Sequence, residues 1–268
     1  MSWVEALLLG IIQGLTEFLP VSSSGHLEIM HHLFGTASEG NLFFAIVVHC
    51  ATVLSTLTVF RKELAEIFKG TFSTVSWNGQ KEYCAKILLS LVPIMVVGLF
   101  FKDEVEGLFG SSLLLVGIGL LLTATLLFVS ERINKKRNGA GHTITYGDSF
   151  IVGLAQTIAI LPGLSRSGTT IATGLLCGVK KEEIAQFSFL MVIIPVLGEA
   201  FLDLVDILRG TLAVAFEWGV LLVGFISAYI VGCLACKFMI RVVSKQKLTY
   251  FALYCCTVGL TIVILTLV

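Results

Sequence analysis

Long apolar segments separated by short polar ones make up most of this chain. Six of them reach the roughly 20 residues that a helix needs to cross a bilayer. They are residues 41–60, 84–101, 111–130, 184–202, 213–236 and 248–268. The pattern predicts an all-α polytopic membrane protein with six transmembrane helices.

Two further apolar stretches are interrupted by polar loops. Residues 3–34 are broken by Pro20 and the Ser-Ser-Ser-Gly run at 22–25, and residues 149–178 by the Ser-Arg-Ser-Gly run at 165–168. Each half of such a stretch is too short to cross a membrane. Irregular backbone at membrane depth is tolerated only where protein or a water-filled cavity satisfies it. We therefore expect two re-entrant helical hairpins.

The two broken stretches also resemble each other at an offset of 143 residues. The matching pairs are Gly10 and Gly153, Gln13 and Gln156, Ser22 and Ser165, Ser24 and Ser167, and Gly25 and Gly168. This similarity predicts an internal repeat, 1–137 and 145–268, within a single membrane domain, 1–268. Because three spans follow each hairpin, and three is an odd number, the second repeat is expected to be inverted. The two hairpins then enter from opposite faces, and their loops meet near the midplane.

Charge is sparse and unevenly distributed along the chain. Charged residues make up 13% of the sequence, the mean hydropathy is +0.95 and the formal net charge is zero. A neutral chain provides no basic field for nucleic acid, so a nucleic-acid partner is not expected.

The basic residues nevertheless indicate an orientation. With the loop after the first span placed in the cytoplasm, fifteen of the eighteen Lys and Arg residues fall on that side. Lys102 and Arg209 fall on the other side among acidic residues, and Arg166 lies in the second hairpin. By the positive-inside rule, both termini are expected outside.

The first hairpin carries several candidate catalytic groups. Gln13 and Glu17 are four residues apart and share a helix face. An ionisable residue in an apolar segment is costly, so Glu17 is a functional candidate. Ser22, Ser23, Ser24 and Gly25 would present hydroxyl and backbone N–H groups at the start of the next half-helix, where phosphate binds. His26 follows one turn later and is a candidate general base.

The second hairpin completes an anion site. Arg166 presents a fork of donors that suits phosphate oxygens. The expected substrate-binding groups around it are Ser165, Ser167, Gly168 and Thr170. Glu17 would add negative charge to the same cavity. A divalent cation, Mg²⁺ or Ca²⁺, held by Glu17 and Gln13 would reconcile this carboxylate with the bound phosphates.

Structural interpretations compete with these functional ones. Glu17 and Arg166 could form a buried salt bridge that holds the two halves together. The serines at 22–24 could serve only as a helix cap, although one serine is enough for that purpose. His49 lies inside a span, and we interpret it as a packed or cavity-lining residue rather than a catalytic one.

The run from Gln13 to His26, followed by the loop from Pro162 to Thr170, resembles the undecaprenyl-diphosphate phosphatase family tied to bacitracin resistance. The resemblance covers nearly the whole chain, with both motifs in order at matching spacing. The family's first motif begins with Glu or Gln and has Glu four residues later. Here Gln13 leaves Glu17 as the only carboxylate of the pair, which weakens any scheme that needs two acids.

The resemblance implies hydrolysis of undecaprenyl diphosphate to undecaprenyl phosphate and inorganic phosphate, which recycles the lipid carrier for cell-wall synthesis. Ser23 is then the expected nucleophile, His26 its general base, and Arg166 the group that binds phosphate. Direct attack by metal-activated water is the rival scheme.

The expected location is the bacterial inner membrane, with the active site open to the outer face. The expected partners are a polyprenyl diphosphate lipid and the bilayer, with a second copy of the chain as a candidate. The main alternative function is an inverted-repeat transporter or flippase of an anionic lipid, because broken helices are also a transporter architecture.

Overall fold

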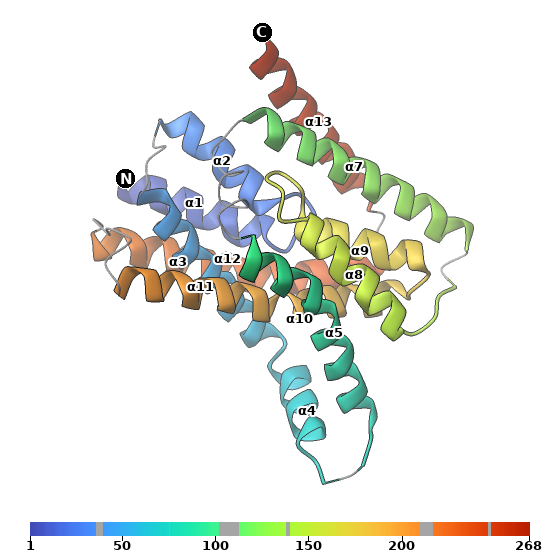
Figure 1. The fold of residues 1–268 in the computed structure, drawn as a ribbon. Helices are drawn as coiled ribbons and strands as arrows, with labels where there is room; N and C mark the ends of the chain where they lie inside the picture. Colours follow the sequence, from blue (N-terminus) through green and yellow to red (C-terminus); the bar gives the residue numbers. More distant parts are fainter. Residues whose placement is uncertain (36–39, 75, 102–112, 138–139, 209–216, 246–247) are drawn as a thin grey trace.

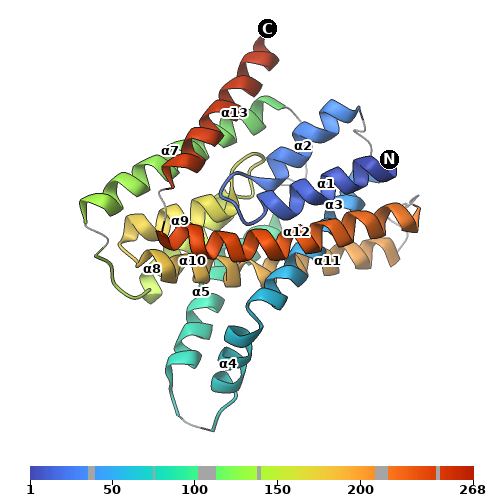
Figure 2. The same ribbon diagram turned by 180° about the vertical axis from the view of Figure 1, so that it is seen from behind.

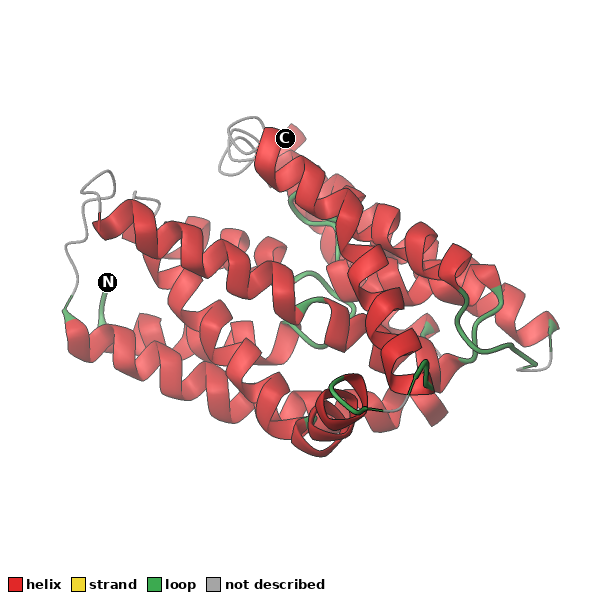
Figure 3. Cartoon of the chain, turned by 60° about the horizontal axis from the view of Figure 1, so that its bottom comes forward, coloured by secondary structure: helices red, strands yellow, loops and turns green. Residues whose placement is uncertain are grey.

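The computed structural model describes residues 1–35, 40–74, 76–101, 113–137, 140–208, 217–245 and 248–268. Helices and loops make up this part of the chain (Figure 3), and its one β feature is an isolated bridge between His142 and Val179. The predicted all-α class is confirmed.

Four helices are long and apolar enough to cross a membrane. They occupy the predicted segments 84–101, 111–130, 213–236 and 248–268, except that residues 111–112 and 213–216 lie outside the described part. Their bounds are α5 (Gly79–Phe100), α7 (Leu113–Lys136), α12 (Trp218–Lys245) and α13 (Thr249–Leu267).

The other two predicted spans are not single straight helices. Residues 41–60 form α3 (Gly40–Val59), which continues after a 74° bend as α4 (Arg61–Thr71). The expected helix over 184–202 is instead divided at Val192 into α10 (Lys181–Met191) and α11 (Ile193–Leu208). Pro195 explains this break, because its nitrogen has no hydrogen to donate to the carbonyl four residues earlier. The described helices therefore include four candidate spans, or five if α3 and α4 count as one, rather than six.

Each of the two stretches predicted to be a re-entrant hairpin forms a pair of short helices joined by a loop. The first is α1 (Trp3–Thr16) with α2 (Ser23–Phe34), and the second is α8 (Tyr146–Ile158) with α9 (Arg166–Cys177). None is long enough to cross a bilayer alone.

Matching caps relate the two hairpins at the same offset of 143 residues. A capping box opens α1 at Ser2 and α8 at Thr145, while left-handed glycines end α2 at Gly35 and α9 at Gly178. The local sequence therefore sets the same start and stop signals in both halves.

Each hairpin packs against a long helix from the other half of the chain. Helix α1 lies along α12, α8 packs on α5, and α7 pairs with α13 (Figures 1 and 2). These contacts bring the loops after α1 and α8 to the middle of the molecule.

The contact between α1 and α12 depends on small residues. A Cβ atom added at Gly10 would lie 2.5 Å from the Gly224 carbonyl oxygen and closer still to the Ser227 hydroxyl. We therefore expect Gly10→Val to destabilise the fold by about 1–3 kcal/mol through overpacking. Thermal unfolding of the protein in detergent measures this effect. Gly98→Ala on α5 is the matched control, because its added Cβ meets nothing within 4 Å; equal melting temperatures for the two variants would contradict the prediction.

Candidate active site

The loops of the two hairpins meet, as predicted. The Ser167 hydroxyl donates a hydrogen bond to the Leu19 carbonyl across the two loops, at 3.3 Å. Gly25 and Gly163 approach so closely that a Cβ on Gly25 would lie 3.1 Å from the Gly163 Cα. Gly163 itself has a φ of +80°, and an added Cβ would clash with the Val116 carbonyl of α7. Only glycine fits this position.

The loops end in two helix N-termini with the same cap. The Ser22 hydroxyl accepts from the Gly25 backbone N–H at 3.2 Å, and the Ser165 hydroxyl accepts from that of Gly168 at 3.1 Å. Ser22 holds φ at +70°, a left-handed conformation that is rare outside glycine. Ser22 and Ser165 are both buried. Ser22 and Ser165 are therefore helix caps. The hydroxyls of Ser23 and Ser167 take no part in these cap hydrogen bonds.

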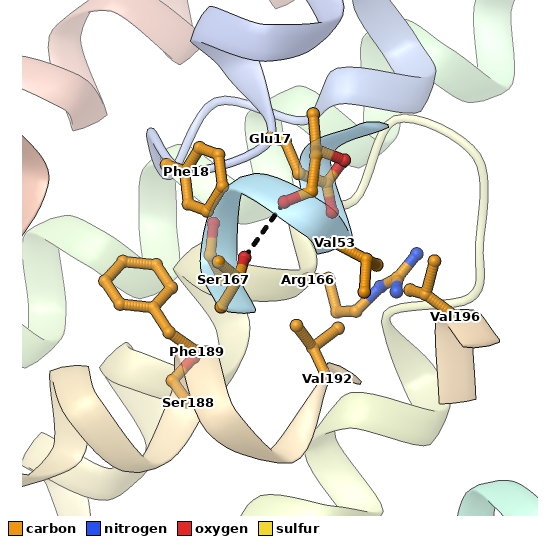
Figure 4. Close-up of a pocket in the computed structure, with 11 residues that line it drawn as sticks. Glu17, Phe18, Val53, Arg166, Ser167, Ser188, Phe189, Val192 and Val196 are labelled. Atoms are coloured by element: carbon orange, nitrogen blue, oxygen red, sulfur yellow. Dashed lines mark hydrogen bonds between the residues drawn. The ribbon is translucent and has the colours of Figure 1, made fainter. Parts of the chain in front are cut away.

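Two hollows adjoin where the loops meet, and they share Glu17, Arg166 and Ser167. The first, here called the polar cavity, is lined by Thr16, Glu17, Ser22, Ser23, Ser24, Ala159, Leu164, Ser165, Arg166 and Ser167. The second, here called the apolar cavity (Figure 4), is lined by Glu17, Phe18, Thr52, Val53, Thr56, Arg166, Ser167, Ser188, Phe189, Val192 and Val196. A charged centre therefore has a hydroxyl-rich chamber on one side and a mainly hydrocarbon one on the other.

Glu17 is the hub of the hydrogen bonds in the first loop. Its Oε2 atom accepts from the Ser23 hydroxyl at 2.6 Å and from the Gln13 amide at 2.9 Å. The Nε2 atom of His49 lies 3.6 Å from the same oxygen, and the Glu17 side chain is 13% exposed. A serine hydroxyl that donates to a partly buried carboxylate has a proton acceptor already in place.

His49 belongs to this cluster, although the sequence favoured a packing or lining role for it. Its Nδ1 atom donates to the Ala45 carbonyl at 2.8 Å, because a carbonyl oxygen can only accept. The other ring nitrogen, Nε2, is the atom that faces Glu17. An ionisable residue inside an apolar span already marks His49 as a functional candidate. The sequence does not show that His49 faces Glu17.

Arg166 is the first residue of α9 and lines both cavities. Within the part of the chain that the structure describes, its guanidinium forms no ion pair, and the proposed structural salt bridge to Glu17 is absent. Figure 4 shows the guanidinium near Val196. A cation without an internal partner, at a helix N-terminus inside a cavity, suits an anionic ligand.

His26 is not where its expected role requires. Its Nδ1 atom donates to the Ser22 carbonyl at 2.7 Å, and its Nε2 atom is 2.7 Å from the Tyr254 hydroxyl on α13. The His26 and Tyr254 rings are stacked with centroids 5.6 Å apart. His26 lines neither cavity, and the Ser23 hydroxyl donates its hydrogen bond to Glu17 rather than to His26. The expected Ser23–His26 pairing is absent from this arrangement.

The remaining predicted binding residues divide into two groups. Ser24 and Ser167 line the polar cavity. Thr170 is buried, and its hydroxyl lies 2.5 Å from that of Ser188 on α10, so it ties α9 to α10. Gly25 and Gly168 contribute the backbone N–H groups that the caps already engage.

Comparison with known proteins identifies the family. The sequence model of the family described as "Bacitracin resistance protein BacA" matches residues 6–261. The chain belongs to this family. Among relatives of this BacA family member, the undecaprenyl-diphosphatase of Bacteroides fragilis is 55% identical over 268 residues, 99% of each chain. The undecaprenyl-diphosphatase of Parabacteroides distasonis is 54% identical over 100% of this chain and 99% of its own length. The undecaprenyl-diphosphatase of Carboxydothermus hydrogenoformans is 40% identical over 99% of this chain and 98% of its own.

The oxygen atoms in the site of this BacA family member fit a hard cation. Gln13 is fully buried and lines neither cavity, but its Oε1 atom has no hydrogen-bond partner among the described residues and its amide bonds the Glu17 carboxylate, which lines both cavities. No group of three His, Cys, Asp or Glu residues that could hold a metal occurs in the described chain. The donor set therefore suits Mg²⁺ or Ca²⁺ shared with phosphate oxygens, since Mg²⁺ is often bound by one or two carboxylates plus a substrate phosphate.

Proposed function

We propose that this chain hydrolyses undecaprenyl diphosphate to undecaprenyl phosphate and inorganic phosphate. This reaction recycles the lipid carrier for cell-wall synthesis and confers bacitracin resistance. The observation that carries the proposal is Arg166, which forms no ion pair with the described residues and lines the same cavity as the Ser23–Glu17 hydrogen bond. Relatives that match nearly the whole chain and are named undecaprenyl-diphosphatase support the same reaction.

The two cavities suit the two chemical parts of this substrate. The hydroxyls of the polar cavity and the N-termini of α2 and α9 can bind the diphosphate. Phe18, Phe189 and Val192 in the apolar cavity can contact the first prenyl units of the lipid. The boundary between the two cavities lies at Arg166, which can contact both phosphates.

Ser23 is the nucleophile in the proposed mechanism. Its oxygen attacks the terminal phosphorus while Glu17 takes its proton, and the bond from that phosphorus to the bridging oxygen breaks, which releases undecaprenyl phosphate. Glu17 passes this proton to the bridging oxygen of the departing undecaprenyl phosphate and is again a carboxylate. Water then attacks the phosphoserine phosphorus and gives a proton to Glu17, which returns it to the Ser23 oxygen as the Ser23–phosphorus bond breaks and inorganic phosphate leaves. Arg166 stabilises the charge that spreads over the phosphoryl oxygens. With Nδ1 donating to Ala45, His49 attracts the Glu17 carboxylate only when its Nε2 atom also carries a proton.

Gln13 and Glu17 are the residues that would hold a divalent cation, Mg²⁺ or Ca²⁺, which would neutralise phosphate charge when bound. The unpartnered Gln13 Oε1 supports this assignment.

We further propose that the multi-pass chain lies in the bacterial inner membrane with both termini and the cavity opening on the outer face. The support is the clustering of fifteen of the eighteen basic residues on one predicted side. Of the acidic residues predicted for the other side, Asp103, Glu104 and Glu106 lie outside the described residues, whereas Asp203 and Asp206 fall within α11 and Glu217 directly precedes α12.

Purified protein is expected to release phosphate from a polyprenyl diphosphate in the presence of Mg²⁺ or Ca²⁺, and to stop when EDTA is added. Glu17→Gln should lower the rate about 10²- to 10⁴-fold, because the amide cannot accept the Ser23 proton. Glu28→Gln is the matched control, since Glu28 lines neither cavity. An absence of phosphate release with any cation would contradict the proposal and favour transport of an anionic lipid. Equal rates for the two variants would remove Glu17 from the chemistry.

A further inference from the structure

Helix α4 (Arg61–Thr71) differs from every other part of the fold described above. It follows α3 after a 74° bend at Phe60, a buried residue that anchors the corner. Together with the start of α5 it protrudes from the rest of the molecule (Figure 1). It contains no buried residue. Its outer surface therefore needs an environment that the remainder of the described chain does not provide.

The apolar residues of α4 face two directions. Leu64 and Ile67 pack against the core. Phe68 and Phe72 point outward, with 65% and 73% of their surfaces exposed, and their ring centroids are 4.7 Å apart. Trp77, which follows in the connection to α5, is 65% exposed. Three large aromatic side chains thus lie uncovered on one protrusion.

Basic residues flank this aromatic group. At 3.6 residues per turn, Arg61, Lys62 and Lys69 fall with Phe68 and Phe72 within a sector of about 120° around the helix axis. All three basic residues are exposed and form no ion pair within the described chain. Glu63 and Glu66 lie outside that sector. The exposed face of α4 is therefore aromatic and cationic, with Glu63 on the opposite side and the exposed Glu66 about 40° beyond its edge.

We propose that α4 is an interfacial helix that binds the headgroups of anionic phospholipids. Helix α3 is apolar enough to form part of a span, so a helix bent from it by 74° runs close to the membrane plane. Five charged residues within its eleven exclude insertion into the hydrocarbon. Aromatic side chains at the acyl boundary with Lys and Arg at the headgroups are the arrangement that such helices use. This assignment is independent of the proposed phosphatase reaction.

Quenching of Trp77 fluorescence tests the proposal. Replacing Trp3 and Trp218 by Phe leaves Trp77 as the only tryptophan, because the chain contains three. The Trp77-only protein is reconstituted into two sets of vesicles, both made of phosphatidylcholine with the same share of phosphatidylglycerol. In one set the phosphatidylcholine carries brominated acyl chains, and in the other set the phosphatidylglycerol does. Per brominated lipid, phosphatidylglycerol is expected to quench Trp77 at least about twofold more strongly than phosphatidylcholine.

The combined variant Arg61→Gln, Lys62→Gln and Lys69→Gln should remove this preference while bromine quenching persists. Lys135→Gln with Lys136→Gln is the matched control, because this exposed basic pair lies at the far end of α7 and should leave the preference unchanged. No quenching by either lipid would place the hairpin in water or against a protein, and would overturn the proposal. Equal quenching by the two lipids, or a preference that survives the triple substitution, would overturn it as well. Phosphate release by the Trp77-only protein reports separately on the reaction.

Discussion

Arg166→Ala is expected to lower kcat/KM for the polyprenyl diphosphate about 10³- to 10⁵-fold, the range found for arginines that stabilise phosphoryl transfer. The physical reason is that Arg166 is the cation that lines both cavities without an ion-pair partner in the described chain. The variant loses the positive charge that would face the phosphoryl group, but it loses no salt bridge within the described chain. Its melting temperature should therefore stay close to that of the original protein. Arg166→Lys should recover only part of the activity, since an ammonium group cannot replace the planar guanidinium fork.

Phosphate release by the two Arg166 variants, alongside thermal unfolding in detergent, measures these effects. Arg132→Lys is the matched control, because Arg132 is exposed and its guanidinium lies 4.6 Å from the Phe128 ring centroid, away from both cavities. Near-normal turnover in Arg166→Ala would remove this residue from the site. A large drop in melting temperature would instead restore the structural salt-bridge interpretation.

Ser23→Ala should reduce turnover by about a thousandfold or more, as removal of a nucleophile does in other covalent mechanisms. The structure supports this expectation through the 2.6 Å hydrogen bond from the Ser23 hydroxyl to Glu17. The original protein, quenched in acid during turnover of a substrate labelled at the terminal phosphate, should carry the label on Ser23. The alanine variant should carry none.

Ser130→Ala provides the control for Ser23, because the Ser130 hydroxyl donates to the Leu127 carbonyl within α7 and lines no cavity. Its turnover should match that of the original protein. If Ser23→Ala keeps activity within about tenfold of the original, the covalent mechanism is wrong and direct attack by water takes its place. The Arg166 prediction would stand in either case, since both mechanisms build charge on the same phosphoryl oxygens.

Features that depend on neighbours within one element could be predicted from the sequence. The hairpin loops, their serine caps and the shared helix face of Gln13 and Glu17 follow from spacing alone, because residues four apart on a helix are adjacent. The Gln13–Glu17 hydrogen bond confirms that face. The 143-residue similarity and the prolines in the two loops also indicate where the chain breaks between α1 and α2 and between α8 and α9. The apolar composition of residues 184–202 predicts one continuous span. The structure instead divides this segment at Val192, because Pro195 removes a backbone hydrogen bond.

The partner of each side chain across helices could not be predicted in the same way. His26 follows the loop of the first hairpin in sequence, yet it turns to Tyr254, 228 residues away. His49 lies in an apolar span, yet it faces Glu17. Thr170 belongs to the second motif, yet its hydroxyl is buried against Ser188. Such contacts depend on which helix faces pack together, and residue spacing does not encode that packing.

The sequence by itself therefore determined the membrane-helical class, the two polar loops and the gathering of serines and one arginine in them, because apolar length, helix periodicity and side-chain charge are local properties. Only the tertiary structure decided that Ser23 donates to Glu17 rather than to His26, that His49 faces the same carboxylate, and that Arg166 and Glu17 share a cavity without forming an ion pair. These three results depend on how α2, α3, α9 and α13 pack around the loops, and that packing places groups within hydrogen-bonding distance that are far apart in the chain.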